Sequence, residues 1–301
     1  MSVTRFVTAA AAALAALLAC AAPASAWTKK SHGLIAAAAT AKLPEEMPKF
    51  FRDAIKELHD LASEPDNWKL IRGSNLSATE GPEHFIDMEY LGGKAFPKTR
   101  QDATRFYYSL PADPDDPPDA RPERVGYLPW ALQEYHTRLA LAFREYRKDP
   151  ENAAARMKCV MYAGLLCHYT GDAAMPLHTT RWYDGLKPDV KGGRPPYKGI
   201  HLKIDKFPED RGFGLKELSD GVKPREIPDV WAHITEFIKE SHTHVDRCYG
   251  LERDGKIDNP DDATREFISS RTKAATQLTV DLWYSAWLES EKLVKTIRSD
   301  W

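Results

Sequence analysis

The chain has 301 residues, 43% of them hydrophobic, and carries 42 Lys and Arg against 44 Asp and Glu, a formal net charge of −2. Proteins that clamp long duplex DNA without regard to sequence usually have a large excess of Lys and Arg, because their affinity comes from releasing phosphate counterions. The near balance of charge therefore excludes stable duplex binding of that kind. No shift in composition marks a second domain, so we expect a single domain.

The N-terminal segment is typical of a secretory signal peptide. Arg5 precedes a run rich in Ala and Leu, and Ala24-Ser25-Ala26 is a small-x-small cleavage sequence. Cleavage there predicts a secreted or periplasmic domain of residues 27–301 that begins at Trp27. An alternative hypothesis takes Leu-Ala-Cys20 as a lipoprotein signal. No later segment has the roughly 20 consecutive apolar residues of a spanning helix, so we expect no transmembrane segment.

Apolar residues recur at helical spacing along most of the chain, and no long stretch alternates with a period of two. This pattern predicts an all-α fold. Two segments rich in Pro or Gly, Pro111–Arg124 and Lys187–Gly199, are predicted to be loops because these residues are unfavourable inside helices. The helices are expected near residues 32–42, 47–62, 129–147, 152–172, 229–247 and 262–297.

Three cysteines follow the predicted cleavage point: Cys159, Cys167 and Cys248. Cys159 and Cys167 are separated by eight residues of predicted helix, or about 12 Å, which is too far for a disulfide between them. Two alternatives remain open. One of the two cysteines pairs with Cys248, or all three are buried thiols that act as small apolar residues.

The segment CHYTGDAAMPLHTT contains the strongest functional pattern in the chain. His168 and Asp172 are four residues apart, which places both on one face of a helix. Pro176 ends that helix, so His178 follows it in a loop. Imidazole and carboxylate groups in this arrangement are suitable ligands for a divalent metal such as zinc.

Other candidate ligands lie before and after this segment. His201 and Asp205 repeat the His-x-x-x-Asp spacing and again share one helical face. Taken alone, a histidine often has only a structural hydrogen bond, so the order of the whole set is more informative than any single member. The upstream candidates are Trp27, His32, Asp66 and the sequence His84-Phe85-Ile86-Asp87.

The ordered set resembles the phospholipase C/P1 nuclease superfamily, and its S1/P1-type nuclease branch most closely. The resemblance runs from Trp27 to Asp205. It implies a single-domain helical fold with long connecting loops and three zinc ions. The first zinc would be bound by Asp66, His84, His168 and Asp172, the second by His178, His201 and Asp205, and the third by the amino group and carbonyl of Trp27, by His32 and by the shared Asp172.

The resemblance also implies a mechanism in which Asp66, Lys69 and Asp172 are catalytic. Water between the first and third zinc ions, its pKa lowered to about 7, would attack phosphorus in line, and the second zinc would stabilise the leaving 3′ oxygen. Lys69 stands where the family has a cationic residue that offsets charge on the phosphate oxygens. Trp27 could bind zinc only as a free amine, so removal of the signal peptide would be required.

Phe85 and Asp87 favour nucleic acid as the substrate. They match the aromatic residue and the carboxylate that, in the nuclease branch, stack on a base and accept its hydrogen bonds. Asp205 also favours the nuclease branch, because the phospholipase branch tends to have Glu there. Two features depart from the family pattern: Glu64-Pro65 replaces the usual Trp before Asp66, and the segment after His84 is longer than expected.

We therefore predict a secreted zinc hydrolase that cleaves single-stranded DNA or RNA to 5′-phosphorylated products and also acts as a 3′-nucleotidase. The alternative is a phospholipase C acting on phosphatidylcholine-type lipids with the same metals. A third hypothesis, from a different class, is a zinc-binding protein without turnover. The sequence does not determine base preference or oligomeric state. Of the other histidines, His59, His136 and His233 are predicted to be core or surface residues. His242 and His244 are predicted to lie on the solvated surface, because residues two apart on a helix project to different faces.

Overall fold

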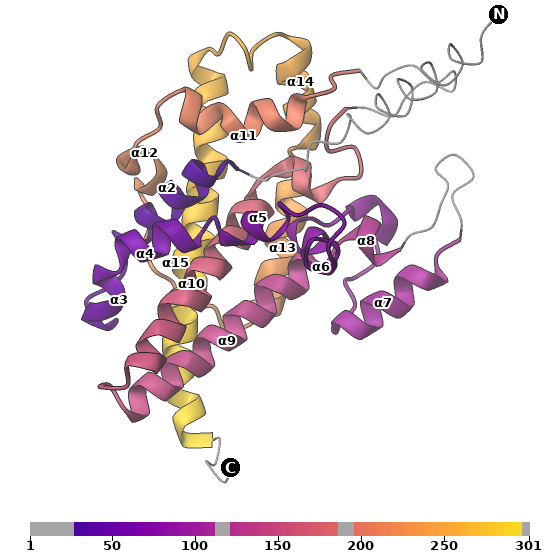
Figure 1. Cartoon of the computed structure of the whole chain (residues 1–301). Coiled ribbons are helices and arrows are strands. Elements are labelled where there is room, and N and C mark those ends of the chain that lie inside the picture. Colours follow the sequence, from indigo (N-terminus) through magenta and orange to yellow (C-terminus); the bar gives the residue numbers. More distant parts are fainter. Residues whose placement is uncertain (1–26, 112–120, 186–195, 297–301) are drawn as a thin grey trace, which may run out of the picture.

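The computed structural model describes residues 27–111, 121–185 and 196–296, and in these ranges every regular element is a helix. The predicted all-α fold is therefore confirmed (Figure 1). The elements are α2 (Lys29–Thr40), α3 (Lys49–Asp53), α4 (Ile55–Leu61), α5 (Glu64–Trp68), α6 (Asn75–Glu80), η1 (Gly81–His84), η2 (Met88–Leu91), α7 (Arg100–Ser109), α8 (Pro122–Val125), α9 (Leu128–Lys148), α10 (Ala153–Ala174), η3 (Pro176–Thr179), α11 (Ile200–Asp210), α12 (Leu215–Ser219), α13 (Val230–His242), α14 (Val245–Arg253) and α15 (Asp262–Thr296).

The core is built around α10, which packs against the two other long helices, α9 and α15, and against α2 and α4 (Figure 1). Every residue from Ala163 to Ala174 is buried. A helix that is covered on all sides needs apolar or fully paired residues around its whole circumference. Trp283 of α15 fixes one of these contacts, since its Nε1 donates a hydrogen bond to the carbonyl of Ala163 at 3.1 Å.

The C-terminal end of α10 lies deep in the protein, and this places polar residues inside the core. The helix ends before Pro176, as the sequence predicted, but the next residues form the short helix η3 and not a loop, so His178 lies on a 3-10 helix. Arg271 of α15 donates from Nε to the carbonyl of Ala174 at 3.1 Å and so satisfies a helix-end carbonyl. His168 and Asp172, in the last turns of α10, are completely buried.

Several predicted boundaries need correction. The segment 47–62 is broken at Ala54 into α3 and α4, and 229–247 is divided into α13 and α14. The predicted loop Pro111–Arg124 contains the helical turn α8, which begins at Pro122 because proline is well suited to a first helical position. Residues 112–120 of that loop, most of the Lys187–Gly199 loop and the predicted signal peptide lie outside the described residues.

Cys159, Cys167 and Cys248 are all buried free thiols. Of the two alternatives, the structure supports buried thiols that pack as small apolar residues. Burial raises the pKa of each thiol to about 12, which keeps them protonated and unreactive.

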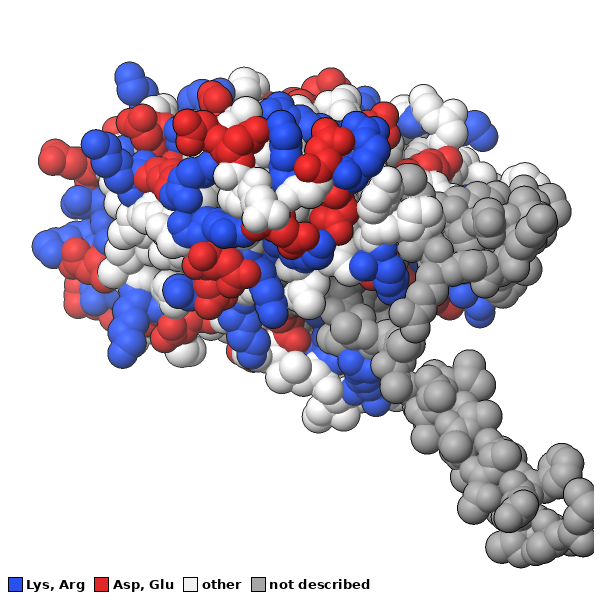
Figure 2. Space-filling view, turned by 90° about the horizontal axis from the view of Figure 1, so that it is seen from above, with Lys and Arg blue, Asp and Glu red and all other residues white. Residues whose placement is uncertain are grey.

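The described surface mixes both signs of charge. Figure 2 shows Lys and Arg side chains interspersed with Asp and Glu over one face of the molecule, as the balanced composition predicts. Within the described ranges, no helix is both long and apolar enough to cross a lipid bilayer.

Candidate metal centre

Five predicted ligands meet in one buried group, which we call the Asp172 cluster: His32, Asp66, His84, His168 and Asp172. They come from α2, α5, η1 and α10. Asp172 lies at the centre of the group. Its Oδ1 is 3.4 Å from His32 Nε2, and its Oδ2 is 3.0 Å from His84 Nδ1 and 3.4 Å from His168 Nε2. The sequence spacing of His168 and Asp172 therefore does place both side chains on the same side of α10.

A glycine beside Asp172 gives the N-terminal segment room to approach. A Cβ atom on Gly171 would lie 2.7 Å from His32 Nδ1 and 3.5 Å from the Trp27 ring. Its carbonyl also accepts a hydrogen bond from Trp27 Nε1 at 3.0 Å, and Trp27 is fully buried. The start of the predicted mature chain is thus held against the Asp172 cluster.

Backbone carbonyls orient the histidines that are candidate ligands. His168 Nδ1 donates to the carbonyl of Ala62 at 2.8 Å, which leaves a lone pair on Nε2. That Nε2 lies 2.9 Å from His84 Nδ1 and 3.9 Å from Asp66 Oδ1. A hydrogen bond to the far nitrogen of a ligand histidine, which fixes its tautomer and direction, is usual in metal sites.

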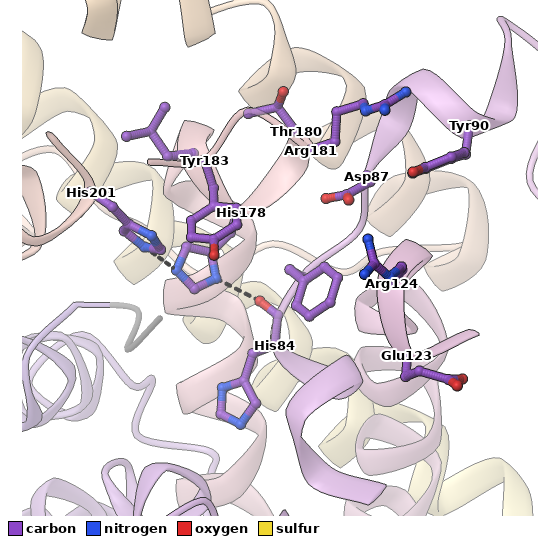
Figure 3. Close-up of a pocket in the computed structure, with 12 residues that line it drawn as sticks. His84, Asp87, Tyr90, Glu123, Arg124, His178, Thr180, Arg181, Tyr183 and His201 are labelled. Carbon is purple, nitrogen blue, oxygen red and sulfur yellow. Dashed lines mark hydrogen bonds between the residues drawn. The ribbon is translucent and has the colours of Figure 1, made fainter. Parts of the chain in front are cut away.

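The other three predicted ligands, His178, His201 and Asp205, form a second group, the Asp205 cluster. Figure 3 shows two of them, His178 and His201. His178 lies on η3 and donates from Nδ1 to the carbonyl of His84 at 2.6 Å. Its Nε2 is 2.8 Å from Nε2 of His201, and that atom is 3.3 Å from Asp205 Oδ2. His201 and Asp205 lie one turn apart on α11, as their spacing predicted.

Both clusters contain atoms that a metal ion would satisfy. Among the described residues, neither nitrogen of His32, neither oxygen of Asp205, nor Oδ1 of Asp172 makes a hydrogen bond, although all are buried. Such atoms are costly in a protein interior unless a ligand compensates them. In each of three triplets the candidate ligand atoms lie within 4.8 Å of one another. The mixed imidazole and carboxylate donor set fits zinc.

In the Asp172 cluster burial opposes charge on His32 and His84, whereas the carboxylates of Asp172 and Asp66 outweigh burial and raise the pKa of His168. Burial lowers the pKa of His32 to about 4 and of His84 to about 3, so both rings are neutral at pH 7. Burial alone would raise the pKa of Asp172, but His168 and hydrogen bonds from the neighbouring histidines hold it well below its usual range. The carboxylate is therefore ionised.

The Asp205 cluster differs in this respect. Burial, together with the negative charges of Asp172 and Asp66, raises the pKa of Asp205 well above its usual range. Burial also lowers the pKa of His201 and of His178. Without a cation, this group cannot hold its carboxylate charge at low cost.

Lys69 lies at the C-terminal end of α5 and is largely buried. Its Nζ is 2.8 Å from Asp66 Oδ1, so the cation is next to the Asp172 cluster. Burial opposes it, but the charges of His168 and Lys69 lower the pKa of Asp66 below its usual range. The structure thus brings Lys69 to the site, and its predicted action on a phosphate stays a prediction.

A cavity of about 380 Å³ opens beside the ligands, and both predicted substrate-binding residues, Phe85 and Asp87, lie on its wall. We call it the Phe85 pocket (Figure 3). The extended segment that carries these two residues is held by two backbone bonds, Ile86 N to His178 O at 2.9 Å and Asp87 N to Val125 O at 2.8 Å. The lining residues are His84, Phe85, Asp87, Tyr90, Glu123, Arg124, Leu177, His178, Thr180, Arg181, Tyr183 and His201.

Gly126 allows the chain after α8 to approach this wall closely. Its φ angle is +89°, and a Cβ atom there would lie 2.0 Å from the carbonyl oxygen of Phe85. Any larger residue would move Phe85 or the turn, because both the backbone angle and the space require glycine.

Some residues of the site were not identified in the sequence. Glu80 accepts a hydrogen bond from the Tyr169 hydroxyl and lies 3.7 Å from His84 Nε2, so it supports that ligand from behind. Its position four residues before His84 was an available signal. Asp184 Oδ1 accepts from the backbone N of Gly199 and of His201, at 2.8 and 3.3 Å, and so positions α11. Nothing in the local sequence marks it.

Two histidines that the sequence assigned to solvated surface are better described as packed residues. His242 is half-buried, and its Nδ1 lies 3.0 Å from the carbonyl of Thr179. His244 Nε2 is 2.7 Å from Glu240 Oε1. Neither belongs to a metal-binding group among the residues described, which agrees with their exclusion from the predicted ligands.

No family model matches this chain, and no curated protein matches it. Two solved structures are similar in the path of the backbone. Alpha toxin from Clostridium absonum is 15% identical, with a TM-score of 0.47, and alpha-toxin from an avian strain of Clostridium perfringens is 17% identical, with a TM-score of 0.44. Each match covers 93% of this chain and 67% of the other. Similarities this distant say nothing about activity.

Proposed function

We propose that this chain is a zinc-dependent phosphodiesterase of the phospholipase C/P1 nuclease superfamily, exported and matured at Trp27. One observation carries the proposal: the eight predicted ligand side chains, far apart in sequence, converge on two buried clusters that border one open pocket. Only the pairs His168/Asp172 and His201/Asp205 are brought together by their spacing, so the convergence of the other residues supports the proposal independently.

The residues that would hold the ions are those of the Asp172 and Asp205 clusters, with the amine of Trp27 beside His32. When bound, zinc lowers the pKa of a coordinated water to about 7 and polarises a phosphoryl oxygen. The chain itself supplies the rest. Burial excludes bulk water from the ligands, and Lys69, next to Asp66, offers a fixed positive charge for the phosphate oxygens.

The Phe85 pocket favours nucleic acid as the substrate. Phe85 is half-buried on the pocket wall, next to the ligand His84, so a base stacked on it would belong to the nucleotide being cleaved. Stacking contributes about 1 to 3 kcal/mol per base and tolerates any base. The products would carry 5′ phosphates, and 3′-nucleotides would also be hydrolysed.

A second candidate, phospholipase C activity, is favoured by a different observation. Three apolar side chains after Lys69 are strongly exposed: Leu70 at 63%, Ile71 at 75% and Leu76 at 53%. Exposed apolar side chains grouped in one segment are a feature of surfaces that contact lipid or protein. They would suit an enzyme that works at a lipid surface.

One assay tests both candidates. The mature protein, saturated with zinc, is given single-stranded DNA, RNA, phosphatidylcholine vesicles and bis(p-nitrophenyl) phosphate, and its zinc is measured by elemental analysis. We expect close to three zinc ions per chain and faster cleavage of nucleic acid than of lipid. Cleavage of lipid alone would favour the phospholipase. Zinc binding with no hydrolysis of any substrate would indicate a binding protein.

A further inference from the structure

The Phe85 pocket combines an apolar wall with charges of both signs (Figure 3). The rings of Phe85 and Tyr183 and the side chain of Leu177 form apolar parts of the lining. The charged groups are two carboxylates, Asp87 and Glu123, and two guanidinium groups, Arg124 and Arg181. A ligand of this pocket must therefore present a flat apolar face and an edge with both donors and acceptors.

Arg124 is the pocket cation that is best placed to bind a ligand. Its guanidinium makes no hydrogen bond or ion pair with another residue in the described parts of the chain, and the side chain is exposed. Its backbone is nevertheless fixed. The neighbouring Val125 is fully buried, and its carbonyl accepts the hydrogen bond from Asp87 N. Arg124 and Asp87 are thus attached to the same rigid wall of the pocket.

Arg181 is held in place by aromatic rings. Its guanidinium carbon lies 4.9 Å from the ring centre of Tyr90 and 4.7 Å from that of Trp182. Its backbone N donates to Glu89 Oε2 at 3.1 Å. Stacked guanidinium groups keep their orientation, so Arg181 provides a fixed positive charge in the pocket lining in addition to that of Arg124.

The mixture of charges in the lining favours a neutral ligand over a charged one. A second phosphate group would bring its negative charge near Asp87 and Glu123. The quaternary ammonium of a choline headgroup would bring its positive charge near Arg124 and Arg181, and known cages for such groups are aromatic. A neutral heterocycle with mixed donor and acceptor edges meets neither penalty.

We propose that the Phe85 pocket selects guanine, with Phe85 under the ring, Asp87 accepting from N1–H and the N2 amino group, and Arg124 donating to O6 and N7. The proposal rests on the proposed phosphodiesterase function and names the substrate it favours. Arginine is the side chain that pairs with the O6 and N7 acceptors of guanine, because its planar donors match their separation. Adenine offers a lone pair at N1, which would face the Asp87 carboxylate, and a donor at N6 where Arg124 needs an acceptor.

The test compares three mononucleotides that differ only at the base edge. The zinc-loaded protein beginning at Trp27 is assayed with 3′-GMP, 3′-IMP and 3′-AMP, and bis(p-nitrophenyl) phosphate serves as a substrate without a base. We expect kcat/KM for 3′-GMP to exceed that for 3′-AMP by about 5- to 150-fold, the range of one good bidentate pair. 3′-IMP, which lacks only the N2 amino group, should lie between them.

Two variants assign the preference to Arg124. In Arg124→Ala the ratio of kcat/KM for 3′-GMP to that for 3′-AMP should fall toward one. The ratio is measured within one protein, so a general loss of activity does not affect it. Arg105→Ala is the matched control, because Arg105 is 77% exposed, is paired with Asp102 and is not part of the pocket lining. It should keep the wild-type ratio and the wild-type rate on the base-free substrate.

The outcomes separate this inference from the proposed function. Equal kcat/KM for 3′-GMP and 3′-AMP in the wild type, or a ratio unchanged in Arg124→Ala, would overturn guanine selection while leaving the nuclease in place. Cleavage of the base-free diester with no cleavage of any nucleotide would refute the nucleic-acid substrate itself. The same nucleotides are also titrated into the protein at equilibrium, so that a preference is measured even without turnover.

Discussion

The two clusters differ in how the charge of their buried carboxylates is compensated. In the Asp172 cluster the carboxylates face imidazoles and Lys69, and these contacts hold the pKa of Asp172 and of Asp66 below the usual range. In the Asp205 cluster the buried carboxylate has no such compensation, and its pKa is raised. The charge of the first group is therefore compensated by the protein itself, whereas the carboxylate of the second would need a bound cation to compensate its charge.

The clusters also differ in how the fold supports them. The Asp172 cluster is built on the end of the central helix α10 and collects ligands from three other elements. The Asp205 cluster lies on η3 and α11 at the edge of the Phe85 pocket, with His178 and His201 both on the pocket lining. A change in the first should disturb both chemistry and packing, and a change in the second should act mainly through the metal.

The largest effect is expected for Asp172→Asn. This carboxylate contacts three histidines and is predicted to bridge two ions. Replacing a residue that only orients a ligand already costs about 10- to 100-fold in activity or metal affinity, so loss of a bridging ligand should cost more than about 100-fold in kcat. The measurement is hydrolysis of bis(p-nitrophenyl) phosphate with zinc content determined in parallel.

Asp102→Asn is the control, because Asp102 is an exposed carboxylate on α7 outside both clusters. It should keep the wild-type rate and zinc content. Wild-type turnover in Asp172→Asn would show that the carboxylate does not bridge two ions. The Asp172 cluster would then be no more important for activity than the Asp205 cluster.

An N-terminal extension should affect the Asp172 cluster alone. Trp27 is buried beside His32, and an added residue would turn its free amine into an amide, which is a far poorer ligand. We expect a tag before Trp27 to reduce activity about tenfold or more and to remove one zinc, with the helical content unchanged. Proteolytic exposure of Trp27 should restore both, and full activity with the tag attached would show that the amine is not a ligand.

Much of the candidate site could be predicted because several of its candidate ligands lie close together in the sequence, at a spacing that is typical of one helical face. The spacing of His168 and Asp172, and that of His201 and Asp205, determines a shared helical face whatever the rest of the fold does. The long helices α9, α10 and α15 were predicted for the same reason, since many turns of one period give a strong signal.

The rest could not be predicted because it depends on contacts between distant segments. Helices of five or six residues, such as α5 and α6, contain too few turns to show a period. The break at Ala54 leaves no mark in a hydrophobic pattern that continues across it. The guanidinium groups of Arg124 and Arg181 come to one pocket only through the three-dimensional fold, so no spacing rule identifies them.

A substitution at Phe85 tests whether the Phe85 pocket contributes to substrate binding independently of the two clusters. Phe85→Ala removes the ring without changing a ligand, so single-stranded DNA cleavage should fall about 5- to 150-fold relative to cleavage of bis(p-nitrophenyl) phosphate. The quantity to measure is the ratio of the two kcat/KM values in wild type and variant. An equal loss on both substrates would indicate a packing role for Phe85 and would favour the phospholipase hypothesis.

The smallest expected effect is a change in the Tm of the metal-free protein. It tests directly whether the buried carboxylates of the two clusters differ in their electrostatic compensation. Because the folded-state pKa of Asp205 is raised, the folded protein binds this proton more tightly than the unfolded chain. The contribution of Asp205 to stability is therefore full below about pH 4 and is lost as the pH rises toward the folded pKa. Asp172 has a lowered pKa, so its contribution is present at pH 7 and is lost at low pH.

Asp205→Asn should consequently raise the Tm of the metal-free protein at pH 7, and Asp172→Asn should lower it. An uncompensated buried polar group costs about 1 to 3 kcal/mol, which for a chain of this size corresponds to a few degrees. Differential scanning calorimetry in the presence of a chelator measures both variants, and repeating it at pH 4 should shrink the gain from Asp205→Asn, since the wild-type carboxyl is then protonated. With zinc bound, Asp205→Asn should instead lower the Tm, because Asp205 is then a ligand whose loss destabilises the folded state. A lower Tm for metal-free Asp205→Asn at pH 7 would mean that the protein itself compensates this carboxylate, and the two clusters would then be electrostatically equivalent.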